Sequence, residues 1–168
     1  MGVPVEIERK YVIEMPSEAT LRAQDGYTVS HILQTYLESE PNVTHRVRMR
    51  AYTDRTVYTE TRKVRIDKIS AYEDEREISE GEYLSLLENI RSGTHTLVKT
   101  RHSFTYLGQT FEVDTYPEWE NSAIFETELE SRDTSVKMPP FIRIIAEVSG
   151  DKRYSNASMA ESFPEELI

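Results

Sequence analysis

The feature that most constrains the fold of this chain is an alternation of charged and apolar residues with a period of two. In the stretch EIERKY, for example, Glu6, Glu8 and Lys10 are spaced two residues apart. Side chains at this spacing point to one face of an extended strand, and the residues between them point to the other face. The alternation therefore predicts β-strands with one charged face, which either is exposed to water or lines something.

Eight segments alternate in this way or are rich in β-branched and aromatic residues, which favour strands. They are residues 4–14, 28–38, 44–52, 55–66, 70–78, 95–106, 109–116 and 122–130. The second segment, TVSHILQTYLE, could also form a helix, but its Thr, Val, Ile and Tyr residues favour a strand. Leu107-Gly108 predicts the turn of a hairpin. Many short strands in close succession predict a β-sandwich or a β-barrel.

The predicted helices are few. Ser79 and Glu82 have the spacing of a capping box, and an apolar pattern follows them, so the main helix is expected over residues 79–92. Shorter helices are expected over residues 18–24 and 155–160. The fold class is therefore mainly β, with a few flanking helices.

Composition and charge exclude several classes of protein. The 168 residues fit a single domain, residues 1–168. The net charge of −10 argues against a nucleic-acid binder, which would normally be basic. We expect a cytoplasmic protein that does not enter a membrane, because the chain has neither a long apolar run nor a signal-peptide pattern. Cysteines are absent, which excludes disulfides and Cys-based metal sites.

The charged faces are sorted by sign from strand to strand. The basic rows are Arg46, Arg48 and Arg50, then Lys99 and Arg101. The acidic rows are Glu73, Glu75 and Glu77, then Glu112 and Asp114, then Glu126, Glu128 and Glu130. On the fourth strand the sequence allows either Thr61 with Lys63 or Glu60 with Arg62 on the charged face, and we favour Lys63.

A single charged row is most often a solvated outer face, but that interpretation weakens when sorted rows recur on seven strands. Inside a barrel, arginines and lysines would bind a polyanion, and the carboxylates beside them would hold divalent cations. A site for an anion alone needs no glutamate cluster, and a site for a metal alone needs no arginine row. The two together predict a phosphate chain bridged by metal.

At this point the chain resembles a known family. EIERKY resembles the ExExK signature that opens the CYTH domain, of the triphosphate tunnel metalloenzyme superfamily, and HRVRMR, EDEREIS, LVKTRHSF, FEVDTY, AIFETELES and IIAEVSGDKRYSNASMA continue the match in order. The resemblance extends roughly from Val5 to Ala160. It implies an eight-stranded antiparallel β-barrel tunnel with its charged lining inward. It also implies hydrolysis of a triphosphate or, in one branch, cyclisation of ATP.

The resemblance further implies roles for individual residues. Binding of the triphosphate is expected from Lys10, Arg46, Arg48, Arg50, Lys63, Lys99, Arg101 and Arg153, the last in a segment that would cover one tunnel end. Mg²⁺ or Mn²⁺ would be held among Glu6, Glu8, Glu75, Glu77, Asp114, Glu126 and Glu128. The residues expected to be catalytic are Glu8, Lys10, Arg48 and Glu77.

Several alternatives stay open at this level. Inorganic tripolyphosphate is the substrate that the resemblance favours. The other hypotheses are a class IV adenylate cyclase, a thiamine triphosphatase and a polyphosphate-binding module without activity. An organic substrate would need an aromatic or apolar shelf at a tunnel mouth, and the sequence does not locate one. The oligomeric state is also open, although barrel edges and an exposed helix make a homodimer plausible.

Overall fold

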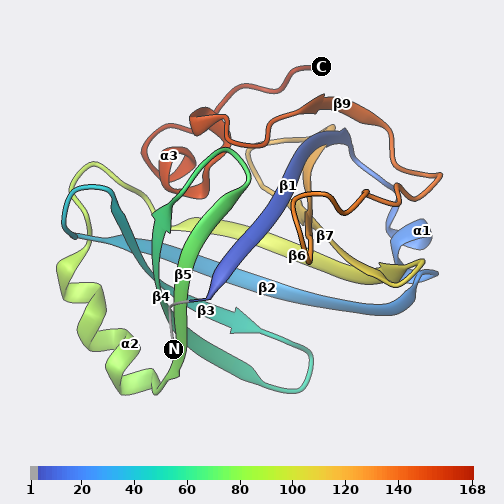
Figure 1. Cartoon of the computed structure of the whole chain (residues 1–168). Helices are drawn as coiled ribbons and strands as arrows, with labels where there is room; N and C mark the ends of the chain where they lie inside the picture. Colours follow the sequence, from blue (N-terminus) through green and yellow to red (C-terminus); the bar gives the residue numbers. More distant parts are fainter. Residues whose placement is uncertain (1–3) are drawn as a thin grey trace.

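Antiparallel strands are the main elements of the computed structural model, which describes residues 4–168 (Figure 1). The strands are β1 (Val5–Glu14), β2 (Asp25–Leu37), β3 (Val43–Ala51), β4 (Thr56–Arg65), β5 (Ser70–Ile78), β6 (Leu97–Tyr106), β7 (Gln109–Thr115), β8 (Ser122–Glu128) and β9 (Ile144–Glu147). The helices are α1 (Glu18–Arg22), α2 (Glu80–Leu86) and α3 (Asn156–Glu161), with short 3₁₀ turns η1 (Leu87–Asn89) and η2 (Lys152–Tyr154).

The first eight strands close into a ring. Hydrogen-bonded neighbours follow the order β5-β4-β3-β2-β6-β7-β8-β1, and β1 also pairs with β5. The seam between β1 and β5 is short, because only residues 5–7 pair with residues 70–72. Further along β1, residues 11–13 pair with β9 instead. The predicted eight-stranded tunnel is therefore confirmed, although its seam is closed along only part of β1.

Two local features differ from the sequence-based prediction. The capping box of Ser79 and Glu82 is present, but α2 ends at Leu86 and η1 ends at Asn89. The chain leaves the helix there because Ile90 is extended and forms a bridge with Leu37 at the end of β2. Strand β9 was not predicted, since its four residues IIAE carry no alternating charge and form a strand by pairing with β1.

The inner face of the ring changes character along its length. On β1 the inward series Glu6, Glu8, Lys10 is followed by Val12, which is fully buried. On β8, Glu128 and Glu126 are likewise followed by buried Ile124, and Val12 and Ile124 are paired in register. These two residues belong to a core cluster that includes the aromatic residues Tyr36, Tyr116, Trp119 and Tyr154 and reaches Met159 of α3. An apolar floor therefore closes the ring below its charged part.

The outer face of the ring is covered in two places. A cluster that includes Phe104, Phe111 and Phe125 packs against α1 and against the loop residues around Ile142. A smaller cluster on β2, β3 and β5 packs against Tyr83 of α2. Apolar residues between the charged ones thus supply the core, as the period of two predicts. No helix within residues 4–168 is long and apolar enough to cross a membrane.

Candidate active site

A cavity of about 630 Å³ lies within the charged part of the ring. Its walls carry nine basic and nine acidic side chains. The basic ones are Lys10, Arg46, Arg48, Arg50, Lys63, Arg65, Arg91, Arg101 and Lys152. The acidic ones are Glu6, Glu8, Glu38, Glu40, Glu73, Glu75, Glu112, Glu126 and Glu128. This balance suits the joint binding of an anion and a cation better than either one alone.

The charges are divided between two arcs of the ring. We call β4, β3, β2 and β6 the basic arc, because β3, β4 and β6 carry the inward arginines and Lys63. We call β7, β8, β1 and β5 the acidic arc, because these strands carry the inward glutamates. Lys10 of β1 is the exception on the acidic arc. The strand order thus places each arc as a continuous wall, with the cavity between them.

Two arginines of β3, Arg48 and Arg50, are held by neutral partners on β2. Arg48 donates two hydrogen bonds, from Nε and Nη2, to Oε1 of buried Gln34 at 3.0 and 2.7 Å, and Gln34 in turn donates to the hydroxyl of Tyr36. Arg50 Nε donates to Ser30 Oγ at 2.8 Å. These bonds fix the guanidinium groups without neutralising their charge. The cations therefore stay available for an anionic ligand.

The electrostatic state of this wall also favours an anion. Burial, together with the charges of Arg46 and Arg101, lowers the pKa of Arg48 to about 9. The Nε of Arg46 is buried and has no hydrogen-bond acceptor among the described residues. An unpaired buried donor is costly, and a phosphate oxygen would satisfy it.

A buried cluster of Arg101, Asp114 and Lys99 lies where this wall meets the apolar floor. The Nε and Nη2 of Arg101 donate to the two oxygens of Asp114 at 2.8 and 2.9 Å, and Lys99 Nζ lies 2.8 Å from Oδ2 of the same carboxylate. Burial lowers the pKa of Lys99 to about 7. The pKa of Asp114 is far below its usual range, because Arg101 and Lys99 outweigh the opposing effect of burial. Both carboxylate oxygens are thus engaged by cations of the protein.

Carboxylates crowd the acidic arc. Across the β1–β8 ladder, Glu8 is in register with Glu128 and Lys10 with Glu126. Burial and the neighbouring carboxylates, led by Glu6, raise the pKa of Glu128 to about 7. Burial raises the pKa of Glu112 as well, against the opposing charge of Arg101. This wall therefore carries mutual repulsion that a bound cation would relieve.

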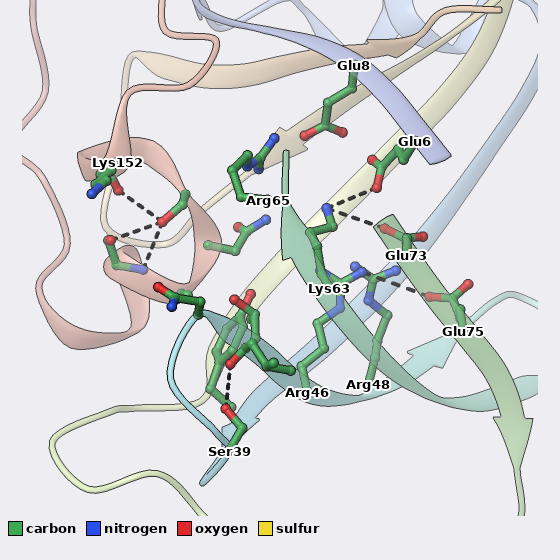
Figure 2. Close-up of a pocket in the computed structure, with 18 of the residues that line it drawn as sticks. Glu6, Glu8, Ser39, Arg46, Arg48, Lys63, Arg65, Glu73, Glu75 and Lys152 are labelled. Carbon is green, nitrogen blue, oxygen red and sulfur yellow. Dashed lines mark hydrogen bonds and ion pairs between the residues drawn. The ribbon is translucent and has the colours of Figure 1, made fainter. Parts of the chain in front are cut away.

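Two lysines lie among these carboxylates. Lys63 Nζ is 3.0 Å from Glu6 and 3.3 Å from Glu73, which Figure 2 shows as one bridging ammonium group. Lys10 Nζ donates to the carbonyl of Tyr154 at 3.1 Å and lies 3.4 Å from Glu126. The structure therefore decides which face of β4 points inward. Lys63 lines the cavity, whereas Arg62 lies on the outer face and is 48% exposed.

The structure brings most of the predicted site residues together. Eleven of them line the cavity: Glu6, Glu8, Lys10, Arg46, Arg48, Arg50, Lys63, Glu75, Arg101, Glu126 and Glu128. Four of them do not line it. Lys99 and Asp114 are buried at the boundary with the apolar floor, and Glu77 is exposed near the end of β5. Arg153 is 75% exposed and pairs with Asp151.

Several lining residues were not among the predicted site residues. Glu73 and Arg65 lie two residues from Glu75 and Lys63 on the same strand faces, so the period of two was the signal that could have located them. Lys152 lies in η2, outside any strand, and no periodicity points to it. Its place in the wall depends on how the segment after β9 folds over the ring.

The carboxylate wall has the donor chemistry of a site for a hard divalent cation, since all its ligand atoms are oxygens. Within residues 4–168, no three His, Asp or Glu side chains converge closely enough to hold an ion without help. Mg²⁺ does not require such a group, because it is usually held by one or two carboxylates together with the phosphates of a substrate. The residues therefore fit a cation that binds with a phosphate chain.

Comparisons with known proteins agree with this geometry. The chain is 30% identical to the inorganic triphosphatase of Acetivibrio thermocellus over 158 residues, which is 94% of each chain. The crystal structure of the inorganic triphosphatase NE1496 matches with a TM-score of 0.60 and 27% identity, covering 95% of this chain and 97% of that one. No family model matches the sequence.

A more distant structure shares the fold alone. HpAC1 from Hippeastrum, a candidate adenylyl cyclase with a dominant triphosphatase activity, matches with a TM-score of 0.50 and 15% identity. The match covers 74% of this chain and 80% of that one. Taken with the ring of eight strands, its two charged arcs and the relative from Acetivibrio, these findings place the chain in the CYTH family of triphosphate tunnel metalloenzymes, beside the inorganic triphosphatases.

Proposed function

We propose that this protein hydrolyses inorganic triphosphate in the ring cavity and that the reaction depends on Mg²⁺ or Mn²⁺. The observation that carries the proposal is the pair of opposed arcs, one basic and one acidic, that share a single cavity. The triphosphatase relatives support the same reaction class. The substrate is a small molecule whose charge is opposite to that of the basic arc.

The basic arc would bind the phosphate oxygens. Arg46, Arg48 and Arg101 line the cavity, and the latter two are already fixed by Gln34 and Asp114. Phosphoryl transfer requires little covalent chemistry from a protein, so positioning and charge stabilisation account for most of the catalysis. Donors that are held in place before the substrate arrives need no reorganisation during the reaction.

The acidic arc would hold the cation. The residues assigned to it are Glu6, Glu8, Glu126 and Glu128. When bound, a divalent cation supplies positive charge that polarises phosphoryl oxygens and lowers the pKa of water. Glu8 lines the cavity and forms no ion pair among the described residues, so its carboxylate is free to orient the attacking water and accept its proton. Attack on the terminal phosphorus forms a P–O bond, and the bridging P–O bond breaks to release pyrophosphate.

Other residues would act by positioning. We assign Asp114 to holding Arg101, because both of its oxygens face protein cations. Glu75 accepts a hydrogen bond from Thr61 at 2.7 Å and lies 3.9 Å from Arg46, which suits a similar supporting role. Glu77 and Arg153 lie outside the cavity wall, and the proposed mechanism does not use them.

The cavity wall disfavours an organic triphosphate. Among the described residues that line it, Tyr36 is the one aromatic side chain, and it is only 2% exposed. A nucleobase or a thiazole would need an open aromatic or apolar surface on which to stack. The β2–β3 loop and α3 contribute mostly polar and charged residues to the lining, beside the small apolar residues Pro41 and Ala157. The geometry thus favours a bare phosphate chain over ATP or thiamine triphosphate.

The test is phosphate release from tripolyphosphate, ATP and thiamine triphosphate, each with Mg²⁺, Mn²⁺ or EDTA. We expect rapid release from tripolyphosphate with either metal and none with EDTA, with activity restored when metal is returned. Cyclic AMP formed from ATP would instead identify a cyclase. Binding of tripolyphosphate without any release would identify a module that holds phosphate chains, and would contradict the proposal.

A further inference from the structure

An apolar patch lies on the outer face of the ring, where β4, β5 and β1 meet. Val64 of β4 is in register with Tyr72 of β5, and Tyr72 is also in register with Val5 of β1. These three side chains and Ile66, two residues beyond Val64, are 38–51% exposed. We call the four residues the hairpin patch. A shallow groove of about 510 Å³ lies over Val64 and Tyr72, beside Val43 of β3. Large apolar side chains gathered in this way mark a contact surface.

The fold covers only the other half of the β4–β5 hairpin. There, Ile78 of β5 packs against Tyr83 of α2 in a core cluster. Figure 1 shows α2 at one end of the hairpin and the β4–β5 turn at the other end. The hairpin patch lies toward the turn, and none of its four residues belongs to a core cluster among the described residues.

A partner on this surface must be recognised by side chains, because the backbone of the hairpin is already paired. Residues 56–64 of β4 pair with β3, and residues 58–65 pair with β5. On the far side of β5, residues 70–72 pair with β1. No strand edge is therefore open at the patch, and a partner would pack on the face of the sheet.

Charges of both signs border the groove. Arg62 of β4 and Asp74 of β5 are in register with each other, one step along from Val64 and Tyr72. Arg62 is 48% exposed and lies 3.6 Å from Glu40, whereas Asp74 forms no ion pair within residues 4–168. A lipid surface or a nucleic acid would be attracted by cations alone. An anion beside a cation suits a partner that presents the same two charges in reverse order.

A second copy of this chain presents that order. In a twofold dimer whose axis runs along the hairpin between β4 and β5, each residue lies opposite its own register partner in the other copy. Val64 then meets Tyr72 of the partner subunit, and Arg62 meets Asp74 of the partner subunit. Each contact occurs twice. Two copies with a net charge of −10 repel each other, and a surface bordered by both signs keeps that repulsion small.

We infer that the protein forms a twofold-symmetric homodimer through the hairpin patch, with Arg62 of each subunit paired to Asp74 of the other. The inference does not rest on the proposed function. The dimer is weak and dissociates on dilution, because a stable interface uses roughly 20–30 residues a side and the patch offers four exposed apolar ones.

The first test is sedimentation velocity of the intact protein without substrate, from about 1 to about 500 µM, which measures the dissociation constant. Tyr72→Glu puts a carboxylate at the centre of the patch and should weaken association at least about tenfold. The matched control is Val98→Glu, which changes a side chain that is 48% exposed on β6, away from the patch. The control should leave the dissociation constant within about twofold. Thermal unfolding of both variants shows that they fold.

The second test exchanges the two charges. In Arg62→Asp two carboxylates would face each other across the axis, and in Asp74→Arg two guanidinium groups would do so. Each variant alone should associate about tenfold more weakly than the intact protein. An equimolar mixture of the two restores both opposite-charge contacts, so it should dimerise about as well as the intact protein. Pairing of Arg62 with Asp74 inside one chain cannot produce that recovery.

Three outcomes would overturn the inference. The first is a protein that stays monomeric at about 500 µM. The second is a dimer that Val98→Glu weakens as much as Tyr72→Glu does, because its interface would then not depend on the patch. The third is a mixture of the charge variants that associates no better than either variant alone. If Tyr72→Glu does not fold, the mixture still decides.

Discussion

The basic and acidic arcs of the ring are built on different principles. On the basic arc, Arg48, Arg50 and Arg101 each donate hydrogen bonds to a side chain that fixes the guanidinium group. On the acidic arc, carboxylates face one another, and the pKa of Glu128 rises to about 7 as a result of burial and that repulsion. The basic wall is thus ready for an anion before one binds, whereas the acidic wall gains stability only with a cation. Anion and cation binding should therefore respond differently to mutation.

The largest effect is expected from Asp114→Asn, which removes the charge that the basic arc depends on. The substitution leaves Arg101 and Lys99 buried without a carboxylate, and breaking a buried ion pair in this way costs about 3–5 kcal/mol. Urea unfolding should show that loss. Lys99→Met is the control, with a smaller loss, because Asp114 keeps its two bonds to Arg101. Full stability of Asp114→Asn combined with lost metal dependence would make Asp114 a metal ligand instead.

Glu8→Gln should affect catalysis and leave the fold intact. The neutral amide can neither hold a cation nor accept a proton from water, so kcat on tripolyphosphate should fall about 10²–10³-fold, as with other lost electrostatic contacts in active sites. Stability should not fall, since the variant removes one of the charges that repel Glu128. Steady-state kinetics with Mg²⁺ measures the change, and Glu118→Gln, in an exposed loop, is the control. Unchanged kcat would contradict the assignment of the acidic arc.

Arg48→Lys keeps the charge of the basic arc and removes the fixed geometry of one of its guanidinium groups. An ammonium group cannot reproduce the two bonds, from Nε and Nη2 of Arg48, that converge on Oε1 of Gln34. We expect kcat/KM on tripolyphosphate to fall about tenfold, a cost of about 1.4 kcal/mol. Arg62→Lys, on the outer face of β4, is the matched control and should have no effect. Equal activity of both variants would show that the charge suffices without the bonds.

The smallest effect is expected from Glu128→Gln in the absence of divalent cations. Removing one of the crowded carboxylates should stabilise the metal-free protein by less than about 1 kcal/mol, because Glu128 is partly exposed and water screens its charge. Thermal unfolding in EDTA should show a slightly higher Tm. With Mg²⁺ and tripolyphosphate present, the same variant should become the less stable one. Glu130→Gln, outside the cavity wall, provides the control.

Much of this arrangement was accessible from the sequence, because the period of two determines which side chains share a strand face. Glu6, Glu8 and Lys10 lie on one inward face, as expected, and Arg46 and Arg48 lie opposite on another. Periodicity alone could not decide between the two faces of β4, since both carry a cation. Pairing with β3 and β5 decided it, by placing Lys63 beside Glu6 and Glu73.

The sequence could not predict how far along the axis of the ring each inward side chain lies. Lys99 and Asp114 share the spacing of the cavity residues, yet they lie at the boundary with the apolar floor, where Lys99 is 6.0 Å from the ring centre of Tyr116. Glu77 has the same spacing, but it lies beyond the end of the cavity that is opposite the apolar floor. Depth depends on the register of neighbouring strands, and register is a property of the closed ring rather than of any one segment.

The way β1 is shared between its neighbours has a consequence for how the molecule assembles. Residues 5–7 bond to β5, and the later part of the strand bonds to β8 and β9. β1 therefore pairs with strands that lie more than a hundred residues further along the chain. Closure of such distant pairs is slow, because the chain loses loop entropy before the contacts repay it. The ladders of β1 with β8 and β9 therefore form after the hairpins that join neighbouring strands, such as β4 with β5 and β6 with β7.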